Sequence, residues 1–127
     1  NATFLLNVGP RPDGTFPDSA LTRLVAIGDW MRVNGASIYG TRGGPVAPRH
    51  WGVTTQKGDT VYVHVLEGPD RGLTLPPLPR RVARAYLLAD GAAVTTATTP
   101  DGVTLTLPHR DAEAADQVVV LVLGALR

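Results

Sequence analysis

The stretch that decides the fold is "FLLNVGPRPDGT", residues 4–15. Its first half is apolar without strict alternation, which is typical of a strand buried on both faces in a parallel sheet. The prolines and glycine that follow predict a tight turn at residues 11–14. Parallel strands are joined by long crossovers, and only three residues precede this strand. We therefore expect that the sheet partners of residues 4–8 lie elsewhere in the chain or in a longer protein.

Apolar residues recur at helical spacing after this turn. They are Leu21, Leu24, Val25, Gly28 and Met31, with Ile27 and Trp30 beside them. The spacing predicts an amphipathic helix over residues 18–34, which Asp18 or Ser19 caps and which stops at Asn34 and Gly35. Strand, loop and helix together make one β/α unit, and a single unit cannot cover both faces of its strand.

The pattern changes after residues 41–45, whose glycines and proline predict a linker. Helical periodicity ends there, and short β-rich runs separated by turns recur about every 8 to 12 residues. The expected strands cover residues 51–55, 60–66, 73–75, 82–88, 93–98, 103–107 and 118–123. The sequence therefore predicts a mainly β fold, in which an antiparallel β-sandwich follows the β/α unit.

Composition excludes several classes of function. The net charge is +1, from 12 basic and 11 acidic residues, and these are spread along the chain rather than clustered as nucleic-acid binding requires. The densest basic stretch, Arg80, Arg81 and Arg84, is interpreted as the solvent face of one strand. The absence of cysteine excludes disulfides, thiolate zinc sites and a cysteine nucleophile. No apolar run approaches the roughly 20 residues that span a bilayer, so neither nucleic acid nor a membrane is an expected partner.

The order of the motifs resembles one family along nearly the whole chain. Residues 4–45 contain "LLNVGP", "DGT", "VNG" and "IYGTRGGP", and "YVHVL", "RVARAYLLADG" and "VVVLVL" follow. This series resembles the last β/α unit and the C-terminal β-sandwich of glycoside hydrolase family 29, the α-L-fucosidases. The resemblance implies a division into residues 1–45, the terminal unit of a (β/α)₈-like catalytic barrel, and residues 46–127, the β-sandwich.

The resemblance also implies a function. The parent protein is expected to be a retaining glycosidase that removes terminal α-L-fucose from glycans without a cofactor or metal. Its substrate would reach the chain through the rest of the barrel, which is the expected intramolecular partner. The family's catalytic carboxyl groups lie upstream of "LLNVGP", so no residue here is assigned a catalytic role and the chain alone is expected to be inactive. The resemblance is compatible with a secreted, periplasmic or lysosomal compartment.

Two polar residues near the end of the first strand are candidates for a binding role. Asn7 interrupts the apolar run, where its amide would hydrogen-bond a catalytic carboxylate or a sugar hydroxyl, or else satisfy buried loop backbone groups. Asp13 follows on the side where a barrel enzyme places its active site. Asp-Gly is also ordinary turn chemistry, and that interpretation is favoured for Asp13.

The aromatic and histidine residues suggest a rival function. The rival is a stand-alone carbohydrate-binding or interaction β-sandwich module, in which Trp51 and Tyr62 would form a sugar-stacking platform if they were exposed, but core or interface positions are favoured for both. His64, in the middle of a strand, is interpreted as a hydrogen-bonded structural residue. His50 and His109 lie in proline-containing loops, and no two histidines have metal-ligand spacing. A buried Trp51 and a partnerless strand at residues 4–8 would favour the fucosidase interpretation over the rival.

Overall fold

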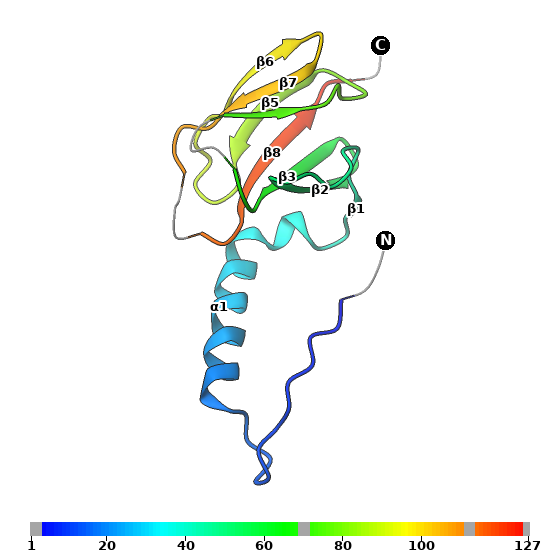
Figure 1. Cartoon of the computed structure of the whole chain (residues 1–127). Coiled ribbons are helices and arrows are strands. Elements are labelled where there is room, and N and C mark those ends of the chain that lie inside the picture. Colours follow the sequence, from blue (N-terminus) through cyan, green and yellow to red (C-terminus); the bar gives the residue numbers. More distant parts are fainter. Residues whose placement is uncertain (1–3, 69–71, 111–113, 126–127) are drawn as a thin grey trace.

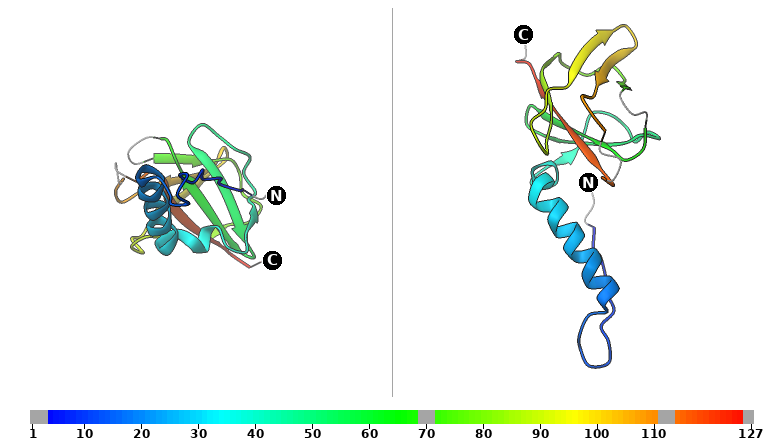
Figure 2. Two further views of the ribbon diagram at one scale, coloured as in Figure 1. Left: turned by 90° about the horizontal axis from the view of Figure 1, so that it is seen from below. Right: turned by 90° about the vertical axis from the view of Figure 1, so that its left-hand side faces the viewer.

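The computed structural model describes residues 4–68, 72–110 and 114–125. A β-sandwich sits at one end of a long helix, and the helix and the N-terminal segment project away from it together (Figures 1 and 2). The helical part consists of α1 (Asp18–Asn34) and a 3₁₀ turn, η1 (Gly35–Ser37). The strands are β1 (Arg42–Gly43), β2 (Gly52–Lys57), β3 (Thr60–Val65), β4 (Gly72–Leu75), β5 (Val82–Leu87), β6 (Thr95–Thr99), β7 (Gly102–Thr106) and β8 (Gln117–Leu123).

The strands form two sheets, and every pairing within them is antiparallel. The larger sheet has the order β1-β2-β3-β8-β5, and the smaller has the order β4-β7-β6. All seven strands expected from the sequence are present, with ends shifted by at most two residues. The mainly β fold class with a C-terminal sandwich is thereby confirmed.

Alternating side chains of both sheets fill the core between them. Val61, Val63 and Val65 of β3 are at most 1% exposed, and Leu105 of β7 is fully buried opposite them. Two turns bring backbones too close for any side chain. A Cβ on Gly52, at φ +147°, would stand 1.9 Å from the His64 carbonyl oxygen, and one on Gly102 would meet the Leu75 carbonyl at the same distance. Only glycine fits such positions.

The central strand β8 is covered on both faces. Val119, Leu121 and Leu123 point into the sandwich core. Val118 and Val120 point outward and form a second apolar cluster with Tyr62, against which Trp30, Tyr86, Leu88 and Val122 pack. A strand with two buried faces needs a continuous apolar sequence, which explains why residues 118–123 show no alternation.

Helix α1 has the bounds that the sequence predicts, but its ends are built differently. Neither Asp18 nor Ser19 caps it, because Pro17 occupies the N-cap position without a side-chain hydrogen bond. Asp18 instead forms an ion pair with Arg11 at 3.3 Å. At the other end Gly35 is right-handed, with φ −55°, and the chain continues into η1. A Cβ on Gly35 would lie 2.9 Å from the ring of Tyr39, which is exposed and would have to move aside.

The expected linker at residues 41–45 is partly built into the sheet. Arg42 and Gly43 form β1 and pair with Gln56 and Thr55 of β2. The solvent-face interpretation of the arginines is likewise wrong for one of them. Arg80 precedes β5 and donates to the Asp59 carboxylate at 2.5 Å and to the Gly124 carbonyl at 3.0 Å.

Residues 4–8 form no strand with any of the described residues. They run as an elongated segment beside α1 (Figures 1 and 2), and Phe4 and Leu5 are 84% and 87% exposed. The expected apolar stripe of α1 is also uncovered: Leu21, Val25 and Ile27 are each about half exposed. A strand needs a neighbour to complete its ladder, so the missing β structure is the consequence of the missing partner that the sequence predicts.

Candidate functional site

The loop that follows residues 4–10 is held by hydrogen bonds between its own residues. The Asp13 carboxylate accepts hydrogen bonds from the Thr15 backbone N–H at 3.0 Å and from the Thr15 hydroxyl at 2.8 Å. The backbone bond first, and then the hydroxyl, lower the pKa of Asp13. A general acid needs a pKa raised toward the working pH. The ordinary-turn interpretation of Asp13 therefore accounts for this residue.

Asn7 is exposed and lies over the first half of α1. It lines a shallow depression that Ser19, Ala20, Arg23 and Leu24 complete from the helix. No side-chain hydrogen bond joins Asn7 to the other described residues. Among the described residues the amide satisfies no loop backbone group, and the binding role of Asn7 stays a prediction.

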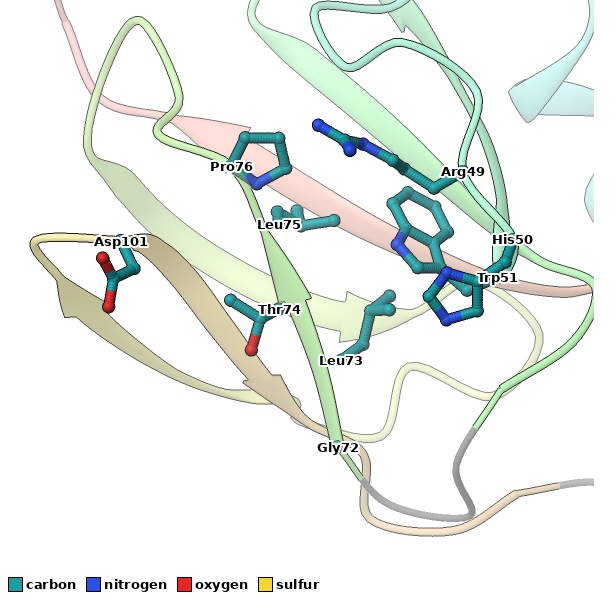
Figure 3. Close-up of a pocket in the computed structure, with 9 residues that line it drawn as sticks. All are labelled: Arg49, His50, Trp51, Gly72, Leu73, Thr74, Leu75, Pro76 and Asp101. Atoms are coloured by element: carbon teal, nitrogen blue, oxygen red, sulfur yellow. The ribbon is translucent and has the colours of Figure 1, made fainter.

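Figure 3 shows a cleft, about 430 Å³ in volume, beside β4, which lies at an edge of the smaller sheet. Arg49, His50 and Trp51 line one side of it, and Asp101 stands at the tip of the β6–β7 turn on the other side of β4. Trp51 is only 3% exposed and belongs to the core. Tyr62, at 8% exposed, belongs to β3 and lies on the outer face of the larger sheet. The two aromatic side chains therefore offer no exposed stacking platform, and the rival carbohydrate-binding function loses its main support.

The most strongly connected polar group in the described part of the chain is centred on His64, at the junction of helix and sandwich. His64 Nδ1 lies 2.7 Å from an oxygen of the Asp116 carboxylate, and Nε2 lies 3.3 Å from the Thr55 hydroxyl. That hydroxyl also lies 2.6 Å from the Ser37 carbonyl. Trp30 completes the group: its indole N–H donates to the Asp116 carbonyl at 3.1 Å, and its ring lies 6.4 Å from that of His64.

The Thr55 hydroxyl has one hydrogen, and the short contact assigns it to the Ser37 carbonyl, which only accepts. The 2.7 Å contact between His64 Nδ1 and Asp116 Oδ2 requires a hydrogen between these two atoms. The contacts therefore join the helix end, β2, β3 and the residue before β8 in one hydrogen-bonded group.

Sequence reasoning identified His64 as a structural, hydrogen-bonded residue, and the contacts confirm it. It missed the partner. Asp116 is 52 positions away in the chain, and an aspartate just before a strand carries no distinguishing pattern. The only available signal was a histidine among valines in "VYVHV", because a buried imidazole must find a partner.

The buried phenol of Tyr62 predicts that the chain loses stability at alkaline pH. Burial, and to a lesser degree the neighbouring Tyr86, raises the pKa of its phenol in the folded chain. An unfolded tyrosine ionises near pH 10, so the contribution of Tyr62 is fully present below that pH and is lost as pH rises through the higher folded pKa. We expect Tyr62→Phe to flatten the alkaline part of a stability–pH curve. Tyr39→Phe, at a residue 65% exposed, is the matched control and should leave the curve unchanged.

These features define a β-sandwich joined to a helical unit whose apolar surface is uncovered. The described residues contain no group of three or more acidic, histidine or cysteine side chains placed to hold a metal ion, and no described helix is long and apolar enough to cross a membrane. Among the described residues that line the cleft of Figure 3, Asp101 is the one that carries a carboxyl group. The fold therefore defines the class as a β-sandwich that follows a helical unit with an uncovered apolar surface.

Comparison with known proteins identifies the family. The α-L-fucosidase family model matches residues 1–36. The α-L-fucosidase of Dictyostelium discoideum is 34% identical over 116 residues, which are 83% of this chain and 25% of that protein. The human tissue α-L-fucosidase is 32% identical over 119 residues, or 84% of this chain and 24% of that protein. The chain thus spans about a quarter of the length of these relatives.

Solved structures agree with these sequence matches. α-L-Fucosidase isoenzyme 1 from Paenibacillus thiaminolyticus superposes with a TM-score of 0.84 at 38% identity, covering 95% of this chain and 30% of that one. A family 29 α-L-fucosidase from Bacteroides thetaiotaomicron, trapped as a covalent intermediate, gives 0.83 at 28% identity over 94% of this chain and 28% of that one. The chain is a member of the glycoside hydrolase family 29 α-L-fucosidases and corresponds to their C-terminal portion.

Proposed function

We propose that this chain is the C-terminal part of a retaining α-L-fucosidase that hydrolyses terminal α-L-fucose from glycans. Residues 1–45 are the last unit of the catalytic barrel, and residues 46–127 are a sandwich that supports it. The partner of the chain is the barrel region of the same parent protein, and the glycan is bound there. The chain supplies neither the nucleophile nor the acid/base carboxyl.

One observation carries the proposal: the exposed apolar side chains are concentrated in the first 39 residues. Of the twelve large ones among the described residues, ten lie there and two, Val53 and Leu66, lie in the sandwich. Apolar patches on this scale mark protein interfaces. A barrel would cover residues 4–8 with neighbouring strands and the α1 stripe with neighbouring helices, and the relatives are several times longer than this chain.

The test is a chimera in which residues 1–127 replace the matching C-terminal segment of the Paenibacillus thiaminolyticus enzyme. We expect the chimera to hydrolyse an aryl α-L-fucoside. The 127-residue chain alone should stay at the buffer blank, because a retaining glycosidase needs two carboxyl groups about 5–5.5 Å apart. A folded chimera without activity, or turnover by the isolated chain, would contradict the proposal.

Asn7 is proposed as a positioning residue that hydrogen-bonds a catalytic carboxylate or a sugar hydroxyl. In the chimera, Asn7→Ala should lower kcat about tenfold, the effect of one lost hydrogen bond of about 1.4 kcal/mol, with little change in Tm. Asn34→Ala is the contrasting variant, because the Asn34 amide donates to the Trp30 carbonyl at 3.2 Å inside this chain. It should lower Tm and leave kcat unchanged. An unaltered rate for Asn7→Ala would return Asn7 to a structural role.

A further inference from the structure

The end strands of the two sheets differ in how well they are protected against pairing with a further strand. The larger sheet ends in β1, which has two residues, and in β5, whose register against β8 shifts between Val82 and Arg84. The smaller sheet ends in β4, which Pro76 follows directly, and in β6. Short strands, bulges, charged side chains and prolines are the usual protection of an edge. β6 has five residues and none of these features.

The outer edge of β6 is accessible along its whole length. Thr96 is half-buried, and the other four residues of the strand are exposed. All five residues pair with β7 without a shift of register. Outside that ladder, no backbone hydrogen bond joins β6 to another of the residues that the structure describes. An exposed, uncharged edge of this kind is a template for an added strand.

The sequence of β6 indicates which strand fits this edge. It is "TTATT", residues 95–99, and it is the same in both directions about Ala97. When a strand pairs antiparallel with its own copy across a twofold axis, each residue faces the one at the mirrored position. In β6 that arrangement sets threonine opposite threonine on either side of an alanine pair. Cross-strand threonine pairs are favourable, and the strand brings no like charges together.

The backbone of β6 favours the same register. The two-residue turn of Pro100 and Asp101 joins β6 to β7, and Thr99 pairs with Gly102 across it. The pair that flanks such a turn is hydrogen-bonded, and along an antiparallel ladder such pairs alternate with residues whose N–H and C=O groups point away. Thr96 and Thr98 therefore turn these groups toward the open edge. A twofold axis at Ala97 sets Thr96 opposite the partner subunit's Thr98, so the outward groups of both copies meet.

We propose that β6 pairs antiparallel with β6 of a second copy of this chain, about a twofold axis at Ala97, and joins the two smaller sheets into one. β6 lies at the end of the sandwich remote from α1 (Figures 1 and 2), so this surface is separate from the uncovered apolar residues of the helical unit. One five-residue strand buries less than the roughly 1,200 Å² of a standard interface, so the pair is reversible. The inference goes beyond the proposed function, because it needs neither a barrel nor turnover.

A single introduced thiol tests the pairing, because the 127-residue chain has no cysteine. Ala97→Cys places the thiols of two copies opposite each other in a non-hydrogen-bonded pair, whose Cα atoms lie about 4.5 Å apart, within the range of a disulfide. Thr95→Cys is the matched control, because it lies on the same face of β6 but faces the partner subunit's Thr99. Under mild oxidation we expect Ala97→Cys to form a disulfide-linked dimer at least about tenfold faster than Thr95→Cys, since paired strands hold the thiols together. Non-reducing electrophoresis over time measures both rates.

A further variant tests the backbone pairing itself. Thr98→Pro removes an N–H that points toward the partner subunit, and proline is tolerated on an edge strand where its N–H faces solvent. Added to Ala97→Cys, it should slow the cross-link to the rate of Thr95→Cys and leave the far-UV circular dichroism unchanged.

The comparison of the two cysteine variants is decisive even if Thr98→Pro fails to fold. Equal rates for Ala97→Cys and Thr95→Cys would overturn the proposal. Fast cross-linking of both would show that copies meet through another surface, such as the helical unit, and slow cross-linking of both would show that β6 does not pair with its own copy. A fast Ala97→Cys cross-link that a folded Thr98→Pro variant does not slow would also overturn it.

Discussion

Replacing His64 by alanine is expected to lower the free energy of unfolding by about 1–3 kcal/mol, the usual effect of leaving a buried hydrogen-bonding group without its partner. The His64 side chain is 4% exposed and that of Asp116 is 16% exposed. Loss of the imidazole would leave the Asp116 carboxylate with neither oxygen paired, since Oδ1 already lacks a partner. It would also remove the contact with the Thr55 hydroxyl and the ring beside Trp30. Urea unfolding monitored by Trp fluorescence measures the change.

His109→Ala is the matched control for this variant. His109 forms the other histidine–aspartate pair, with Asp90 at 3.1 Å, but the two side chains are 51% and 45% exposed. Exposed pairs contribute about 0–1 kcal/mol. Equal effects of the two substitutions would show that the His64 group does not join the helix to the sandwich as its contacts indicate.

Periodicity predicted the strands well because each inward side chain is fixed by its own position in the pleat. Val61, Val63 and Val65 alternate with Tyr62 and His64, and a slip of one residue would exchange the two faces. The helix was predicted from the same principle with a different period. These patterns are local, so they survive even where the surrounding protein is not present.

The parts that escaped prediction depend on contacts between distant residues. Nothing near Asp116 in the sequence indicates that it pairs with His64, and the two-residue strand β1 is too short for any pattern. Gly35 was expected to stop the helix, but it is right-handed, with φ −55°, and the chain continues into η1. Nothing in the sequence around Gly35 indicates this short continuation.

Among the candidate site residues, too, the locally determined roles were predictable and the roles that depend on distant contacts were not. Asp13 was predictable as a turn residue, because Asp and Gly meet a local requirement of the backbone. The role of Asn7 stays a prediction, because no side-chain hydrogen bond joins it to the other described residues. The contacts of Asp116 with Trp30 and His64 become apparent only when the helix and the two strands are brought together in the fold.

The uncovered apolar surface predicts that the isolated chain self-associates. Phe4 and Leu5 are more than 80% exposed, and Val25 is 56% exposed. Burying one such side chain contributes about 1.5–3 kcal/mol, so each removed contact should weaken association at least about tenfold. We expect Leu5→Ser combined with Val25→Ser to shift the chain toward monomer in size-exclusion chromatography with light scattering. Leu66→Ser, at a 46% exposed residue of the sandwich, is the control and should not. If the unaltered chain is already a monomer at high concentration, residues 4–39 do not form an interface that requires a partner, and the barrel proposal loses the observation that carries it.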